Sequence, residues 1–160
     1  MANNAFGIDL GTNNIKIYNR NDDNIMIEKN MIAIENKNTL FAYGNSAFEM
    51  YEKAPSNIQV VFPMQNGVIS HFKDMQYLLT NLLNPERKFM RGSEYVIAVP
   101  TDVTEVEKKA FFDLVSYSTA RAREVKIVER GIADAVGLGL NIFEEKGILI
   151  ANFGGGTTDI

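Results

Sequence analysis

Two glycine-bearing turns near opposite ends of the chain have the composition of anion-binding loops. The first, GIDLGTNN, spans residues 7–14, and the second, NFGGGTTD, spans residues 152–159. Each turn follows a run of apolar residues that is typical of a buried strand. Glycines allow the backbone to bend tightly, so that main-chain N–H groups and small hydroxyls converge on an anion. Two such turns could hold one polyphosphate from both sides.

Each turn also has a plainer interpretation. Residues 11–14 fit an ordinary β-hairpin turn, because Gly and Asn both tolerate a positive φ. The three glycines at 154–156 could instead form a flexible connector. The rest of the chain has to decide between these interpretations and an anion-binding site.

The composition is that of an ordinary globular protein. With 160 residues, of which 46% are hydrophobic and 22% charged, the chain is long enough for one sizeable core or two small lobes. The net charge of -4 argues against nucleic acid as the main partner, because a surface that follows phosphates is normally basic. The absence of Cys excludes disulfides and fits a reducing cytoplasm. We find no signal-peptide pattern and no uncharged apolar run of about 18 residues, and therefore expect neither export nor a membrane span.

The first part of the chain predicts antiparallel strands. Short β-branched or aromatic segments alternate with Asn, Asp and Lys clusters, which indicates strands at residues 5–10, 15–18, 25–28, 31–35 and 39–43. A short helix at 46–53, a strand at 58–62 and a turn at 63–67 follow. Apolar residues at helical spacing then predict a helix over 71–83.

The second part predicts a strand–helix–strand rhythm. Residues 95–99 form a fully apolar strand, and Thr104 with Glu107 makes a capping box for the next helix. A strand at 124–128, a helix at 132–140 and a strand at 148–153 complete the series. This order favours parallel pairing through right-handed crossovers, so we expect one sheet that mixes antiparallel hairpins with parallel strands.

Five segments, in this order, resemble the MreB family of bacterial actins. They are GIDLGTNNIKIY, FPMQNGVISHF, VIAVPTDVTEVEKKAFFD, EVKIVERGIADAVGLGL and ILIANFGGGTTDI, and the resemblance covers essentially the whole chain. It implies an α/β fold that is actin-like and related to ribonuclease H, with a mixed five-stranded sheet, helices and a small strand-rich subdomain. Residues 1–30 and 65–148 would form the large subdomain of the first lobe, residues 31–64 the small one, and residues 149–160 the start of a second lobe. Because the chain stops directly after the second turn, we expect it to be only the N-terminal half of a longer protein.

The resemblance also implies a site for ATP and Mg²⁺. Asp9 corresponds to the aspartate that faces the metal ion through water. The residues around the phosphates would be Gly11, Thr12, Asn13 and Asn14 from the first turn, and Gly154, Gly155, Gly156, Thr157 and Thr158 from the second. Thr157 would lie nearest the attacking water.

Two positions depart from the family pattern. Arg130 stands where the family has the glutamate that orients the attacking water, and Asn152 stands where it has an aspartate that helps to hold the hydrated metal. A guanidinium has no hydrogen-bond acceptor, and an amide is a poorer ligand for a hard cation than a carboxylate. We therefore expect a protein that binds ATP with weak or absent hydrolysis.

Two alternatives to lost hydrolysis stay open. An arginine near a γ-phosphate can stabilise transition-state charge, and Asp134, one helical turn after Arg130, could replace the missing carboxylate. We favour instead an i,i+4 ion pair between Arg130 and Asp134.

Residues 84–92, NPERKFMRG, are a candidate for membrane contact. Phe89 and Met90 lie between Lys88 and Arg91, and an apolar tip flanked by cations suits insertion into an anionic lipid surface. MreB proteins resemble this sequence in carrying a hydrophobic membrane-contact loop here. The alternative, that both side chains fold back into the core, stays open.

The resemblance implies a cytoskeletal protein that self-associates into filaments for cell shape or motility, at the cytoplasmic face of the inner membrane. The alternatives are an active ATPase of the same kind and a non-polymerising member of the superfamily that resembles a chaperone or a sugar kinase. The TEVEKKAFFD helix and the small strand-rich subdomain favour a filament protein over the last alternative.

Overall fold

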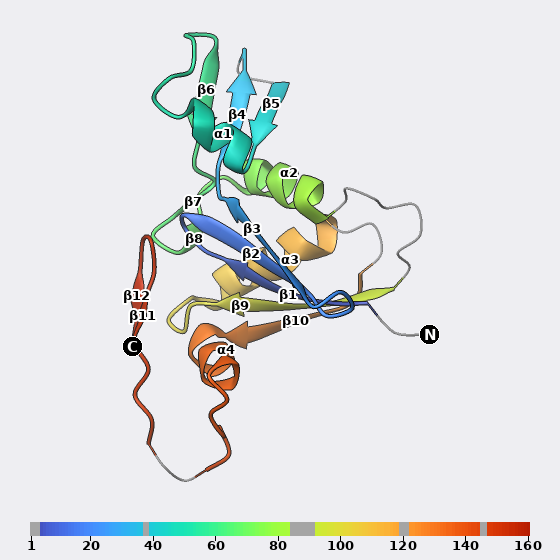
Figure 1. The fold of residues 1–160 in the computed structure, drawn as a ribbon, viewed down its shortest axis with the longest axis vertical. Coiled ribbons are helices and arrows are strands. Elements are labelled where there is room, and N and C mark those ends of the chain that lie inside the picture. Colours follow the sequence, from blue (N-terminus) through green and yellow to red (C-terminus); the bar gives the residue numbers. More distant parts are fainter. Residues whose placement is uncertain (1–3, 37–38, 84–91, 119–121, 145–146) are drawn as a thin grey trace.

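A five-stranded mixed sheet forms the centre of the computed structural model, which describes residues 4–36, 39–83, 92–118, 122–144 and 147–160 (Figure 1). Its strand order is β10-β9-β1-β2-β3. The strands are β1 (Ala5–Leu10), β2 (Asn14–Asn19), β3 (Asn24–Lys29), β9 (Ser93–Val99) and β10 (Ala122–Glu129). β1, β2 and β3 pair antiparallel, whereas β1 pairs with β9, and β9 with β10, in parallel. The prediction of a mixed five-stranded sheet is confirmed.

Helices α2 (Phe72–Leu83) and α3 (Glu105–Ser118) cover one face of this sheet. Their apolar stripes and the inward residues of β1, β2 and β9 form one core, which includes Leu10, Ile15, Ile97, Met75, Leu78, Leu79, Phe111, Leu114 and Val115. The predicted capping box starts α3, since the backbone N–H of Thr104 donates to Glu107 Oε2 over 2.7 Å and the Thr104 hydroxyl accepts from the Glu107 N–H over 3.3 Å.

A smaller three-stranded sheet lies at one end of the long axis (Figure 1). Its order is β5-β4-β6, from β4 (Ile32–Glu35), β5 (Thr39–Tyr43) and β6 (Ile58–Val61). Helix α1 (Asn45–Met50) packs on it, and the buried residues Met31, Ala33 and Ala47 form a second core there. These elements lie within residues 31–64, which supports a small subdomain over that range; the subdomain limits themselves stay a prediction.

A short β-hairpin with a two-residue loop connects the small sheet to α2. β7 (Met64–Gln65) and β8 (Val68–Ile69) are joined by Asn66 and Gly67, whose φ angles are 50° and 79°. Two central residues with positive φ are typical of a type I′ turn, for which Asn-Gly is the preferred pair. The sequence predicted a turn here, and the structure adds the short strands on both sides of it.

The C-terminal part differs most from the sequence prediction. Helix α4 (Arg130–Gly137) begins directly after β10, two residues earlier than predicted. The predicted strand over 148–153 is wrong for its first four residues. Only the short hairpin of β11 (Asn152–Phe153) and β12 (Thr158–Asp159) forms. No described strand pairs with residues 148–151, and Leu149 is 83% exposed, so the apolar run that suggested a buried strand lies outside the core.

No helix within the described residues is both long enough and apolar enough to cross a membrane. Phe89 and Met90, the predicted membrane-contact residues, lie outside the described residues.

Candidate functional site

The candidate site lies where the parallel strands β1, β9 and β10 end. Carboxyl ends of parallel strands share one edge of a sheet, and ligands of open α/β sheets commonly bind there. The first glycine turn follows β1, and α4 follows β10. Side chains alternate along β1: Ile8 and Leu10 point into the core, so Asp9 points to the opposite face, directly across from Lys16 of β2. Asp9 and the start of α4 are thereby placed on one edge.

The first turn closes the hairpin between β1 and β2, so its backbone agrees with the plainer interpretation. The Gly11 N–H donates to the Asn14 carbonyl over 3.0 Å. A Cβ on Gly11 would come within 2.7 Å of that carbonyl oxygen, which explains why glycine is required. A hairpin turn does not exclude an anion site, because the loop residues also face the second turn.

Asn30 forms two hydrogen bonds to the backbone of the first turn. This fully buried side chain donates from Nδ2 to the Gly11 carbonyl over 2.8 Å, and its backbone N–H donates to the Asn13 carbonyl over 2.9 Å. Asn30 is not among the residues proposed from the sequence. A polar residue directly before an apolar strand is an ordinary pattern, so only the fold reveals its role.

The second turn closes the β11–β12 hairpin and is not a flexible connector. The Gly154 N–H donates to the Thr157 carbonyl over 2.8 Å. A Cβ on Gly156 would come within 2.7 Å of Thr12 Oγ1, and a Cβ on Gly155 would overlap the side chain of Asn13. The absence of side chains at 155 and 156 therefore lets the two turns lie against each other.

The β7–β8 hairpin forms a third side. The Gly67 N–H donates to Thr12 Oγ1 over 3.0 Å, and a Cβ on Gly67 would approach the Thr157 methyl group to 2.9 Å. Gly67 belongs to one of the five family-like segments but has no role predicted from the sequence, because its contact with Thr12 spans 55 positions.

The three segments enclose a hollow of about 180 Å³. Nearly all of the residues proposed from the sequence line it, namely Asp9, Gly11, Thr12, Asn13, Asn14, Arg130, Asn152, Gly154, Gly155, Gly156 and Thr157, and Lys16, Gly67 and Phe153 join them. Thr158 does not; it lines a neighbouring hollow with Pro100 and Val103. The volume is below the ~300–1,000 Å³ of pockets that bury a drug-sized ligand, so this hollow would enclose only part of a nucleotide.

Arg130 is the first residue of α4, is only 7% exposed, and lies between two carboxylates. Its Nη1 donates to Asp159 Oδ2 over 3.0 Å, and its Nη2 donates to Asp9 Oδ1 over 3.4 Å. The other oxygen of Asp9 accepts from Lys16 Nζ over 3.0 Å. Asp9 therefore has a cation on each of its two oxygens.

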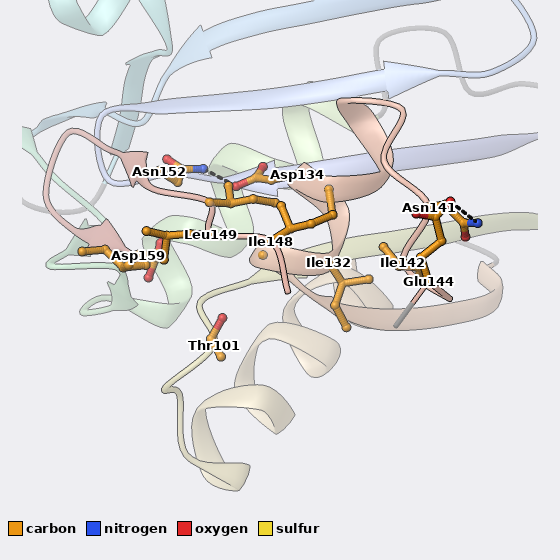
Figure 2. Close-up of a pocket in the computed structure, with 14 residues that line it drawn as sticks. Thr101, Ile132, Asp134, Asn141, Ile142, Glu144, Ile148, Leu149, Asn152 and Asp159 are labelled. Carbon is orange, nitrogen blue, oxygen red and sulfur yellow. Dashed lines mark hydrogen bonds between the residues drawn. The ribbon is translucent and has the colours of Figure 1, made fainter. Parts of the chain in front are cut away.

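The predicted ion pair between Arg130 and Asp134 is wrong. Pairing within the central sheet places Asp9 near the start of α4, the separate β11–β12 hairpin carries Asp159 there, and the guanidinium binds these two carboxylates. The carboxylate of Asp134 instead accepts from Asn152 Nδ2 over 2.7 Å (Figure 2). Arg130 and Asn152, the two positions that depart from the family pattern, thus both bond to aspartates, but not to the same ones.

A larger hollow of about 460 Å³ lies between α4 and the segment before β11 (Figure 2). Ile132 on α4 and Ile148 and Leu149 on that segment give it apolar walls, and it shares Asn152 with the smaller hollow. The polar hollow between the turns and this apolar one are therefore adjacent.

The sheet, its parallel crossovers and the two facing turns define an actin-like fold. The structure superposes on crystal structures of MreB5 of Spiroplasma citri bound to ADP and to AMPPNP, each with a TM-score of 0.87. The ADP-bound protein is 33% identical, over 98% of this chain and 47% of that one. The MamK double helical filament, at 19% identity and a TM-score of 0.72 over 86% of this chain and 44% of that one, supports the fold alone.

The chain belongs to the MreB/Mbl family, since the family model for MreB/Mbl protein matches residues 3–160. The cell shape-determining protein MreB of Escherichia coli K12 is 34% identical over all of this chain and 48% of its own length. Mbl of Bacillus subtilis 168 is 33% identical over 96% of this chain and 46% of its own length. The chain spans about half the length of these relatives.

The residues around Asp9 do not form a site for the magnesium ion that the family resemblance implies. Both Asp9 oxygens already contact cationic nitrogens, and position 152 supplies an amide that donates to Asp134. Within the described ranges, no group of three His, Cys, Asp or Glu side chains is placed to hold a metal ion. The glycine turns, by contrast, offer main-chain N–H groups and the hydroxyls of Thr12 and Thr157 to an anion.

Proposed function

We propose that the natural protein containing this chain is a filament-forming bacterial actin that binds ATP between its two glycine-bearing turns and hydrolyses it slowly or not at all. One observation carries the proposal: the buried guanidinium of Arg130 lies between Asp9 and Asp159, at the position where the family has the glutamate that orients the attacking water. We call this natural polypeptide the full-length protein.

Two observations support ATP as the ligand. The turns approach each other through Gly155 and Gly156 and leave a polar hollow between them. MreB5 of Spiroplasma citri, with a TM-score of 0.87 to this chain, has been crystallised with ADP and with AMPPNP. The backbone N–H groups of the two turns are present whichever side chains stand at positions 130 and 152.

Slow hydrolysis follows from the contacts of the substituted positions. A general base must accept a proton or a hydrogen bond from water, and a guanidinium carries only donors. Asp134 is the nearest alternative base on α4, but Asn152 already donates to its carboxylate. These contacts favour a binder over the alternative of an active ATPase.

Filament formation and a place at the inner membrane rest on family membership. The MreB and Mbl relatives are cell shape-determining proteins. Family membership favours a filament protein over a chaperone-like or sugar-kinase-like one. Membrane contact through Phe89 and Met90 rests on the sequence of their segment alone.

The proposal is tested by two measurements on the full-length protein. Equilibrium binding of ATP should be readily measured, whereas phosphate release should stay near the rate of a blank without protein. Brisk phosphate release would contradict the loss of hydrolysis, and the absence of any ATP binding would contradict the ligand.

A further inference from the structure

We propose that the side chain of Arg130 takes the place of the divalent cation, so that this protein binds ATP without magnesium. The inference rests on the proposed ATP site and concerns the ion that accompanies ATP there. Three features of the structure carry it.

The first feature is that both carboxylate oxygens of Asp9 already contact cationic side chains. By resemblance, this carboxylate should face a hydrated metal ion, yet its two oxygens lie 3.4 Å from Arg130 Nη2 and 3.0 Å from Lys16 Nζ. A metal ion beside Asp9 would have to displace one of these cations or lie next to it, and like charges at such distances repel each other.

The second feature is how firmly Arg130 is held. Its side chain is 9% exposed and bonds to carboxylates from two different hairpins, Asp9 of β1 and Asp159 of β12. The side chain of Asp159 is itself only 15% exposed. Moving Arg130 away would leave a partly buried carboxylate without its partner, which is costly. The guanidinium is therefore a fixed part of the site.

The third feature is the charge of the hollow. Its charged lining residues are Arg130, Lys16 and Asp9, so cations outnumber carboxylates before any metal ion binds. Both departures from the family pattern act in this direction: a guanidinium replaces one carboxylate at 130, and a neutral amide replaces another at 152. A triphosphate can contact cationic side chains of the chain itself here, since an arginine binds phosphate oxygens well.

The test compares ATP binding by the wild-type full-length protein in excess MgCl₂ and in excess EDTA, with calorimetry as the readout. We expect the two dissociation constants to agree within about threefold, which is less than 1 kcal/mol. A larger loss of affinity in EDTA overturns the inference. This comparison needs no variant and so cannot fail through misfolding.

A pair of variants adds a matched control. Arg130→Glu should make ATP binding depend on magnesium, with a loss of affinity of about tenfold or more in EDTA. Lys16→Gln also removes one cation from the hollow, but it restores no carboxylate at 130. It should weaken binding by the same factor in both buffers. If Arg130→Glu binds ATP equally well in both buffers, position 130 does not determine the metal requirement and the inference is wrong.

A direct metal readout uses Mn²⁺ without nucleotide, followed by electron paramagnetic resonance. The wild-type protein should bind no Mn²⁺ at this site. A bound Mn²⁺ that is lost in Asp9→Asn would overturn the inference.

The outcomes separate the two proposals. ATP binding that occurs only with magnesium overturns this inference and leaves the ATP site standing. A lack of ATP binding in both buffers overturns the ATP site and this inference together.

Discussion

Asn152 and Asp159 are partners across the β11–β12 hairpin, and each of them bonds to helix α4. Asn152 donates to Asp134 over 2.7 Å, and Asp159 accepts from Arg130 over 3.0 Å. The second glycine turn is thus attached to α4 through one residue of each of its strands. Any substitution at 130 or 152 consequently changes both the chemistry at the hollow and the attachment of the turn.

The first prediction concerns restored hydrolysis. Arg130→Glu combined with Asn152→Asp should raise phosphate release by about 10²–10⁴-fold, the usual effect of one well-placed general base. The new glutamate can accept from the attacking water, which the guanidinium cannot. Phosphate release by the full-length protein at saturating MgATP is the measurement.

Its control is Arg130→Met combined with Asn152→Asp, which removes the guanidinium without supplying an acceptor. Because position 130 still has no carboxylate, and an aspartate at position 152 alone does not orient the attacking water, this control should not recover activity. Equal rates for the two double variants would mean that loss of the arginine, and not gain of a carboxylate, is what matters.

The second prediction concerns the contact between the turns. Gly156→Ala should weaken ATP binding by about tenfold or more, because the added methyl group would meet Thr12 and push the turns apart. Gly147→Ala is the control, since a Cβ at 147 meets no atom within 4 Å. Calorimetry with ATP compares the two variants, and the same affinity for both would show that the turns do not share one ligand.

The third prediction concerns the buried amide of Asn30. Asn30→Ala should lower the free energy of unfolding by about 1–3 kcal/mol, because the Gly11 carbonyl loses its buried donor. Asn81→Ala also removes an amide that donates to a carbonyl, but that bond is exposed. Its cost should be within about 0.5 kcal/mol. Urea unfolding of both variants is the measurement, and equal costs would contradict the role assigned to Asn30.

The fourth prediction concerns acid sensitivity. Hydrogen bonds from the Thr104 side chain and backbone hold the pKa of the Glu107 carboxyl below its ordinary value of 4.5. A folded-state pKa below the unfolded one stabilises the fold above pH 4.5, and this contribution disappears as the pH falls through the folded-state pKa. Glu107→Gln should therefore lower the melting temperature near neutral pH and make little difference in acid. A difference between the variant and the wild type that stays constant with pH would contradict this.

The fifth prediction concerns membrane contact. Phe89→Ser with Met90→Ser should leave filament formation intact but abolish co-sedimentation with anionic liposomes. Each side chain contributes at most about 1.5–3 kcal/mol to insertion, which becomes sufficient only when a filament presents many copies. Unchanged liposome binding, or loss of folding instead, would favour the alternative in which both residues belong to the core.

Local patterns predicted the elements well and the long-range contacts poorly. The apolar runs of β1 and β9 and the Thr104–Glu107 capping box are set by near neighbours, so the sequence contains them. The Arg130–Asp134 pair was predicted from helical spacing alone. That rule takes no account of Asp9, which lies 121 positions away and reaches Arg130 only through the sheet.

In the candidate site, too, local features could be predicted from the sequence and long-range contacts could not. Both glycine turns were found from their composition, since their residue types are unusual. Asn30 and Gly67 were not given roles, because each acts through a hydrogen bond to a distant part of the chain. The strand predicted at 148–153 failed over its first four residues for a related reason: an apolar run forms a strand only where another strand is placed to pair with it.

Substitutions in the glycine turns and substitutions at positions 130 and 152 have different consequences for the site. The turns act through backbone groups and through the absence of side chains, so almost any mutation at 155 or 156 would harm them. The side chains at 130 and 152 attach the second turn to α4, but neither belongs to the backbone that bends at 11–14 or 154–157. Loss of turnover and loss of nucleotide affinity are thus separable in evolution. A lineage could keep the bound nucleotide as a permanent structural part of the protein after losing the hydrolysis step that limits how long a filament persists.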